Sequence, residues 1–120
     1  MDIKEYLSTR SSSEDNLFGD FMKQRRLELK IRLRDMASSL AISPAYLCDI
    51  EQGNRQAPVK LIKRMAELLQ ISEDEMVDFE DLAYQSHNTC APDIIQYLIA
   101  NPEMRKEIRS IITKSSNFED

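Results

Sequence analysis

The sequence predicts an all-α protein, on three observations. The 120 residues include only two glycines and four prolines, and strong helix formers fill the stretches between them. Apolar residues recur three and four positions apart, as they do on one face of a helix. Helix start signals, such as serine before proline, stand at the heads of these stretches. With 42% hydrophobic residues, a chain of this length can bury one compact core and not comfortably two.

The predicted organisation has three parts. A flexible tail covers residues 1–13, a helical domain covers residues 14–87, and an extension that forms a C-terminal helical hairpin covers residues 88–120. The tail ends in a polar run that has no periodicity, although a helical turn around residues 3–7 is compatible with its pattern.

The first long helix is predicted over residues 14–29. Ser13 is a suitable N-cap for it, and Glu14 and Asp15 place acidic side chains in the first turn, where the helix dipole favours them. Its apolar positions include Leu17, Phe21 and Leu27.

Two short helices follow in the predicted order. The second of them begins at Ser43-Pro44, because serine can cap free backbone amides and proline brings a preset φ to the first helical position. It should end at Gly53, which adopts a left-handed conformation without the steric cost of a Cβ atom. The first of the two covers residues 33–40, with an inward stripe of Leu33, Met36, Ala37 and Leu40.

Four further helices are predicted downstream. Ser72 and Glu75 form a capping-box pattern, which opens a helix that runs to about residue 84. Prolines introduce two final helices over residues 92–100 and 102–114. The helix before the capping box covers residues 58–70 and would bury Leu61, Ile62, Met65, Leu68 and Leu69.

The charge is unevenly distributed along the chain. The net charge is −5, but the segment from Asp20 to Arg64 holds ten basic and five acidic residues, so its own charge is +5 and the remainder carries −10. A basic lobe of this kind is compatible with binding to DNA phosphates, although a solvated helix surface would show the same pattern.

The two short helices around Ala41-Ile42 have the spacing of a DNA-binding unit, in which one helix braces on the backbone and the next enters the major groove. Ala37 is small where the helices approach, and Ile42 plugs the turn. Leu47 and Ile50 attach the second helix to the core. Its opposite face carries Ala45, Asp49 and Gln52, flanked by Tyr46 and Cys48.

The segment 36–72 resembles the helix-turn-helix of the Cro and phage-repressor type, known as the XRE family of bacterial transcription regulators. The resemblance implies a five-helix DNA-binding domain that is usually dimeric on a near-palindromic operator, and many members repress their own promoters. The matching residues, in order and without gaps, are Met36-Ala37, Leu40-Ala41-Ile42-Ser43, Tyr46-Leu47, Ile50-Glu51, Gly53-Asn54-Arg55, Ala57-Pro58 and Met65-Ala66-Glu67-Leu68-Leu69.

Carried onto this chain, the resemblance implies that residues 43–52 form the recognition helix. It also implies a structural ion pair between Arg26 and Glu51, and the inward position of Glu51 requires such a partner independently. Candidate base-facing residues are Ser43, Pro44, Ala45, Tyr46, Asp49 and Gln52. Candidate phosphate contacts are Arg32, Arg34, Asn54, Arg55 and Lys60.

The chain departs from the family pattern in three respects. Leu33 stands where many members have a glutamine that contacts phosphate, so Arg32 and Arg34 are expected to take over that contact. Ala41 replaces a turn glycine, which we expect to be tolerated with a negative φ. The outward face of the recognition helix has no lysine or arginine for a bidentate guanine contact, so specificity would rest on Tyr46, Gln52, thymine-methyl contacts and DNA shape.

Two apolar stripes lie outside the resemblance, in the last two predicted helices. They could fold back on the core, form a dimer interface, or receive a different protein. The last possibility supports a second functional hypothesis, a protein-interaction module such as the antitoxin of a toxin–antitoxin pair, which would use an acidic, apolar C-terminal third. The stripes consist of Ile94, Ile95, Leu98, Ile99, Met104, Ile108, Ile111 and Ile112.

Other functional classes find no support in the sequence. His87 and Cys90 are spaced like half a zinc site, but no second pair accompanies them, so we expect no metal and no cofactor. Cys48 and Cys90 are expected to be free thiols. No nucleophile–base grouping or phosphate loop stands out, so we expect no enzyme. No membrane span or signal peptide is recognisable, which favours a cytoplasmic protein.

Overall fold

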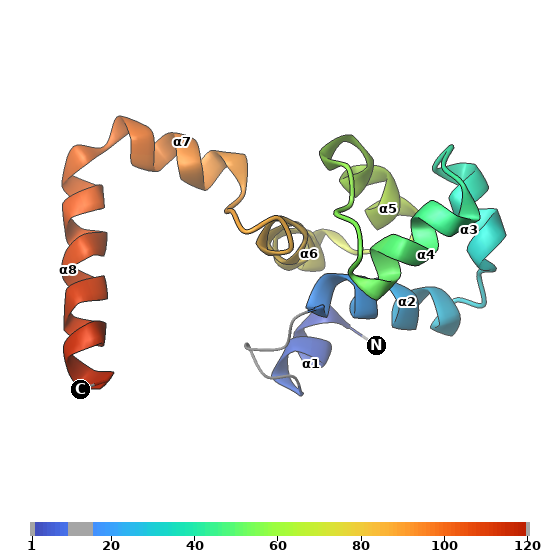
Figure 1. Ribbon diagram of the computed structural model, residues 1–120, viewed down its shortest axis with the longest axis horizontal. Helices are drawn as coiled ribbons and strands as arrows, with labels where there is room; N and C mark the ends of the chain where they lie inside the picture. The colour runs from blue at the N-terminus through green and yellow to red at the C-terminus, as the bar shows by residue number, and fades with distance from the viewer. Residues whose placement is uncertain (1, 10–15, 120) are drawn as a thin grey trace. The chain divides into compact units, whose positions relative to one another are not determined.

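The computed structural model describes residues 2–9 and 16–119, and within these ranges it contains helices and no strand. The all-α prediction is therefore confirmed. The chain divides into two compact units, Met1–Thr89 and Cys90–Asp120, which are described separately below (Figure 1). In order, the helices are α1 (Ile3–Ser8), α2 (Leu17–Glu28), α3 (Leu33–Ser39), α4 (Pro44–Gln52), the 3-10 helix η1 (Val59–Leu61), α5 (Ile62–Leu68), α6 (Glu73–Gln85), α7 (Pro92–Ala100) and α8 (Pro102–Glu119).

An aromatic cluster lies in the core of the first unit. Phe18 and Phe21 of α2 both contact Phe79 of α6, with ring centroids 5.4 and 6.2 Å apart. Tyr6 of α1 packs edge-on against Phe21 at 5.3 Å. Large aromatic side chains remove much apolar surface from water, so this cluster holds α1, α2 and α6 together.

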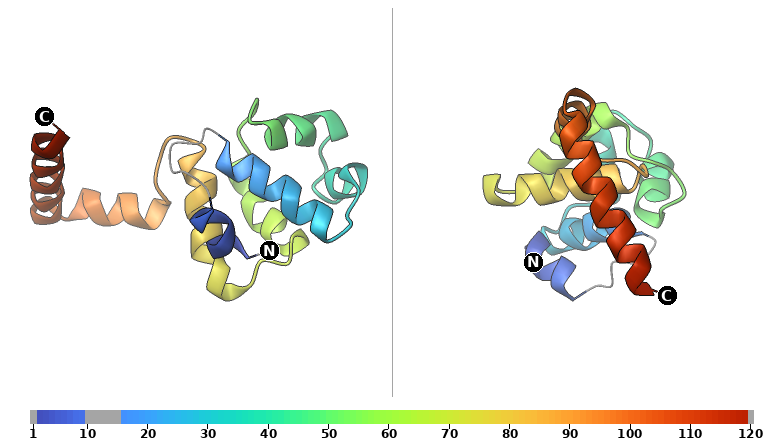
Figure 2. Two further views of the ribbon diagram at one scale, coloured as in Figure 1. Left: turned by 90° about the horizontal axis from the view of Figure 1, so that it is seen from below. Right: turned by 90° about the vertical axis from the view of Figure 1, so that its left-hand side faces the viewer.

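The helical turn that the sequence allows around residues 3–7 is present as α1 over Ile3–Ser8, so this part of the predicted tail is a helix packed beside α6 (Figures 1 and 2). Asp2 caps the helix, and Ile3 and Tyr6 lie three positions apart on one face, where both are buried. The Tyr6 hydroxyl donates a hydrogen bond to the Asp20 carboxylate at 2.8 Å. These contacts of Ile3 and Tyr6 hold the short helix against the first unit.

The first long helix is shorter than predicted at its start. Its proposed cap, Ser13, lies outside the described residues, and α2 begins at Leu17 after Asn16. Leu27, one of the apolar positions of this helix, is 56% exposed. It lies nine residues after buried Phe18, which places it on the opposite side of a helix with 3.6 residues per turn.

Five helices of the first unit end in the same backbone motif. One to three positions after each helix a residue has a positive φ, and the N–H of the residue that follows it bonds to a carbonyl five positions back, as Ile42 does to Ala37 at 3.0 Å. The negative φ that would let alanine replace the turn glycine at Ala41 without strain is not present, because φ is 58° there. The five residues are Lys30, Ala41, Gly53, Gln70 and Asn88.

The remaining boundaries follow the predicted signals with two differences. Ser43 caps α4 and Gly53 ends it with φ 82°, as predicted. Ser72 and Glu75 form the capping box at the start of α6. The helix predicted over 58–70 begins instead as η1 and continues as α5, and α8 runs beyond Lys114 to residue 119.

The second unit consists of α7 and α8. The chain turns sharply between them at Asn101, so α8 runs across the end of α7 and the predicted hairpin is open (Figure 1). Arg105 of α8 fixes this corner, since its guanidinium donates to the carbonyls of Leu98 and Ile99 at 2.6 and 2.7 Å. The carbonyls at the end of α7 are thereby satisfied by a side chain of α8.

Candidate nucleic-acid interface

The pair α3–α4 is built around small and apolar side chains at its turn. Ala37 of α3 is fully buried, which allows the two helices to approach closely. Leu47 and Ile50 of α4 are also buried, and half-buried Ile42 packs against the core from the turn. These four residues occupy the places that the sequence predicted for them, and they set the orientation of α4.

The outward face of α4 is open to solvent. Ser43, Pro44, Ala45 and Gln52 are exposed, while Asp49 is half-buried. The Ser43 hydroxyl oxygen accepts a hydrogen bond from the Tyr46 N–H at 3.1 Å, so its side chain is engaged in capping. The face therefore offers small side chains at its N-terminal end and one amide at its C-terminal end.

A buried ion pair fixes the end of α4. The Arg26 guanidinium binds the Glu51 carboxylate with two hydrogen bonds, at 2.8 and 3.1 Å, and the two side chains are only 8% and 4% exposed. Arg26 also donates to the Ile31 carbonyl at 2.9 Å. The bidentate geometry and the extra bond satisfy both charges, which is the condition for burying such a pair.

Gly19 provides a close approach that sequence reasoning missed. A Cβ atom there would lie 2.6 Å from the carbonyl oxygens of both Ile50 and Glu51, so α2 touches the backbone of α4 directly. Asn16 adds a hydrogen bond from its side-chain amide to the Glu51 carbonyl at 2.9 Å. The available signal was a glycine inside a helical pattern, which often marks close packing.

The comparisons with known proteins agree with this geometry. A family model described as "Helix-turn-helix domain" matches residues 17–79, more than half of the chain. The chain belongs to this helix-turn-helix domain family. A comparison with curated proteins finds no match, and neither does a comparison with solved structures. The matched segment takes in α2 to α5 and the first half of α6, and it leaves out α1, α7 and α8.

Several cations of the helix-turn-helix domain serve its own structure. Arg25 donates to the carbonyls of Leu69 and Gln70 at 3.0 and 3.1 Å, at the end of α5. Arg64 pairs with Glu67 on the surface at 3.0 Å. Together with Arg26, these account for part of the local charge of +5, so the basic lobe presents less charge to a ligand than the sequence suggested.

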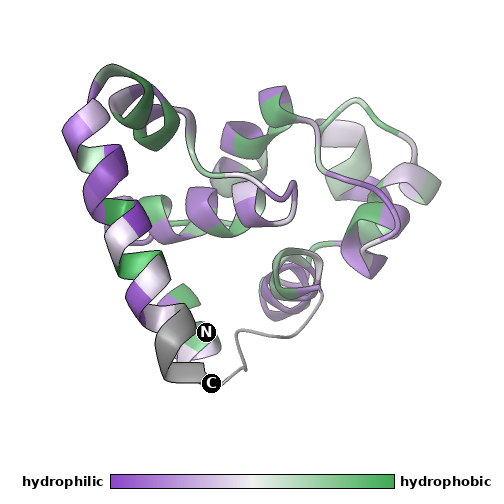
Figure 3. Ribbon diagram, turned by 60° about the vertical axis from the view of Figure 1, so that its left-hand side comes forward, coloured by the Kyte–Doolittle hydropathy of each residue, from purple (hydrophilic) through white to green (hydrophobic). Residues whose placement is uncertain are grey.

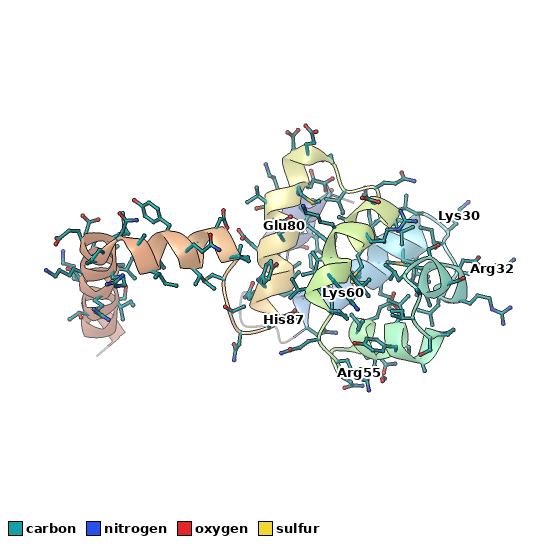
Figure 4. All side chains as sticks on the ribbon, turned by 90° about the horizontal axis from the view of Figure 1, so that it is seen from above. Lys30, Arg32, Arg55, Lys60, Glu80 and His87 are labelled. Carbon is teal, nitrogen blue, oxygen red and sulfur yellow. The ribbon has the colours of Figure 1, made fainter. Side chains whose placement is uncertain are left out.

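Other cations of the domain are exposed. Arg32 and Arg34 lie at the start of α3, beside half-buried Leu33, which packs against the core. Figure 4 shows Arg32 together with Lys30 near the start of α3, and Arg55 apart from them beyond the end of α4. All five predicted phosphate contacts are exposed: Arg32, Arg34, Asn54, Arg55 and Lys60.

Tyr46 and Arg55 form a contact that the sequence analysis treated as two separate sites. The guanidinium carbon of Arg55 lies 4.6 Å from the centroid of the Tyr46 ring. Tyr46 itself is half-buried and packs against the core. One face of its ring is therefore occupied by a cation, and the ring limits the positions that Arg55 can adopt.

The loop after α4 is attached to α6 through the single histidine of the chain. His87 Nε2 lies 2.7 Å from the carbonyl oxygen of Ala57, and its ring packs near Tyr84. Ala57 is buried, so the loop that carries Asn54 and Arg55 is fixed at its far end. This is the role that the structure gives to His87.

No helix in the described part of the chain combines the length and the apolar character needed to cross a bilayer.

Proposed function

We propose that this protein is a sequence-specific, DNA-binding transcription regulator of the XRE type, which acts as a dimeric repressor in the cytoplasm. One observation supports this most directly. The outward face of α4 is exposed while its inward face is fixed by Leu47, Ile50 and the Arg26–Glu51 pair. A rigid helix with an exposed face, between exposed cations, is the arrangement that enters a major groove.

The base contacts in this proposal come mainly from the two ends of α4. Pro44 and Ala45 are small, exposed and apolar, so they suit contact with thymine methyl groups. Gln52 can bind adenine through its side-chain amide, and Asp49 can accept from a cytosine amine. Because none of these residues is basic, DNA shape would contribute a large share of the specificity.

The phosphate contacts come from both sides of α4. Arg32 and Arg34 would contact one stretch of backbone, and Asn54, Arg55 and Lys60 would contact another. Tyr46 would act chiefly by holding Arg55 in position, given the 4.6 Å contact between them. These contacts set affinity and salt dependence and carry no direct sequence information.

The protein-interaction alternative rested on an acidic C-terminal third, and the charges there do not favour it. Residues 88–120 contain five acidic and four basic residues, so this third is close to neutral. Acidic side chains are concentrated instead on α6, which belongs to the first unit and includes Glu73, Asp74, Asp78 and Glu80. DNA binding is therefore the function that the described residues support best.

A gel-shift titration against the DNA upstream of the gene, at two salt concentrations, tests the proposal. We expect Arg55→Ala to weaken binding to specific and random DNA alike, and to lower the salt slope by about one unit. Gln52→Ala should reduce discrimination more than affinity. Lys4→Ala, which removes an exposed charge from α1, is the matched control and should bind as wild type does. Absence of a shift by the wild-type protein at low salt would overturn the proposal.

A further inference from the structure

The second unit carries large apolar side chains that solvent reaches. Ile94 and Tyr97 of α7 are 41% and 54% exposed, and Ile111 and Ile112 of α8 are 63% and 58% exposed. Among the described side chains of these two helices, none is buried. Figure 3 shows hydrophobic and hydrophilic residues alternating around α8, as in an amphipathic helix.

A groove lies in the corner between the two helices. Its volume is about 520 Å³, and its walls are almost entirely apolar. The corner is held by the bonds from Arg105 to the end of α7, so the groove has a defined shape before anything occupies it. Its lining residues are Asp93, Ile94, Tyr97, Leu98, Met104 and Ile108.

Helices that bury no side chain gain little stability from packing, and isolated helices of fewer than about 12–15 residues are marginal in water. α7 has 9 residues and α8 has 18. α7 is below this length, and α8 exceeds it but leaves Ile111 and Ile112 in solvent, so α7 and the apolar face of α8 would gain stability from a covering surface. We propose that this surface is a second copy of the chain, with the two α8 helices paired antiparallel.

The charges along α8 favour a second copy in this orientation. Met104, Ile108 and Ile111 form a stripe at spacings of four and three, which is the core pattern of paired helices. Glu107 and Lys114 flank the stripe on one side and lie one heptad apart. When Ile108 of one copy faces Ile111 of the other in antiparallel register, Glu107 of each copy meets Lys114 of the other, twice across the two-fold axis.

The area available is sufficient for a stable pair. A buried Ile, Leu or Met side chain corresponds to roughly 60–120 Å² of apolar surface. The groove and the stripe contribute six apolar residues, and exposed Ile112 beside the stripe adds a seventh. Since three of the seven are already half-buried, they give at most about 400–800 Å² per copy, which overlaps the roughly 600–1,000 Å² of a standard interface. They are Ile94, Tyr97, Leu98, Met104, Ile108, Ile111 and Ile112.

Sedimentation equilibrium of the full chain, without DNA, tests the proposal. The wild-type protein should dimerise, and Ile108→Lys should be monomeric because it places a charge in the apolar stripe. Ser110→Lys is the matched control on the opposite face of α8 and should dimerise normally. Glu107→Lys and Lys114→Glu should each weaken the dimer about tenfold or more, by replacing two attractions with two repulsions.

The double variant Glu107→Lys/Lys114→Glu should restore the dimer, since each pair is then opposite in charge again. Failure of the double variant to recover would overturn the antiparallel register. A wild-type protein that is monomeric at all concentrations would overturn self-association. In that case, a lower melting temperature of Ile108→Lys than of the wild-type protein would indicate that the stripe packs against the chain's own first unit. The inference rests on the dimeric part of the proposed function. Because the sedimentation experiment contains no DNA, a failure to dimerise is distinguishable from a failure to bind DNA.

Discussion

At the scale of single residues, the closest agreement between sequence and structure is at the ends of α4, where Ser43, Gly53 and Glu51 all occupy their predicted roles. Each of these roles depends on one local physical requirement: a cap for free amides, a positive φ, or a partner for a buried charge. Ala41 also has a positive φ, but alanine, unlike glycine, gives no signal of this in the sequence.

Ala41→Gly should stabilise the protein. Alanine pays a steric cost at φ 58° that glycine does not, and this gain exceeds the extra freedom of glycine in the unfolded chain, so we expect about 0.5–1 kcal/mol. Urea unfolding measures the difference. Gly53→Ala should have the opposite effect, because φ is 82° and the new Cβ would lie 2.8 Å from Asn16 Cγ. Equal stabilities of Ala41→Gly and wild type would show that the strain at Ala41 is no larger than the cost of the extra freedom of glycine in the unfolded chain.

Glu51→Ala should destabilise the domain by about 3–5 kcal/mol, because it leaves the Arg26 guanidinium buried without its counter-ion. Thermal unfolding followed by circular dichroism measures the loss. Glu67→Ala removes the same type of side chain from the exposed pair with Arg64 and should change the melting temperature little. If both substitutions have small effects, the buried pair is not required for the fold.

At the scale of elements, α1 depends on Glu75 of α6. The Glu75 carboxylate accepts a hydrogen bond from the Ile3 N–H at 2.9 Å, and it also accepts bonds from the N–H and hydroxyl of Ser72. Burial by itself raises the pKa of Glu75, but these hydrogen bonds outweigh it, so the pKa lies below the ordinary range. One carboxylate thus joins the start of α6 to α1.

This linkage predicts a loss of stability in acid. A carboxyl group whose pKa is lowered by folding stabilises the native state above its unfolded pKa of about 4.3, and the contribution disappears as pH falls through the lower folded value. Unfolding free energies measured from pH 7 to pH 3 should therefore fall less for Glu75→Gln than for wild type. Parallel pH profiles for the two proteins would contradict this role of Glu75.

α1 also shows the limit of prediction from sequence, which allowed a helical turn around residues 3–7 but not its packing against the domain. The boundaries of α3 and α4 follow from strong local signals, such as Ser43-Pro44, which need no knowledge of the rest of the chain. α1 has six residues, too few to form a helix alone, and it exists through contacts with α2 and α6 that are distant in sequence. The stacking of Arg55 on Tyr46 could not be predicted from the sequence either, because it depends on the path of the loop between the two residues.

At the scale of the whole molecule, the sequence predicted one core and an extension, and the chain divides into two compact units near residue 89. The buried aromatic cluster and the Arg26–Glu51 pair both belong to the first unit. All the proposed DNA contacts lie there too. In our proposal the groove and stripe of the second unit supply the surface for pairing.

A chain ending at Ala91 should therefore separate DNA binding from dimerisation. Because the core residues from Ile3 to Ala83 are retained, circular dichroism should show a cooperatively unfolding helical domain. Sedimentation should show a monomer. Such a monomer contacts one half-site, so it releases about half as many counter-ions as a dimer, and the slope of log K against log salt should fall to roughly half. A truncated protein that still dimerises, or that keeps the full salt slope, would place the pairing surface in the first unit and leave α7 and α8 without a part in DNA binding.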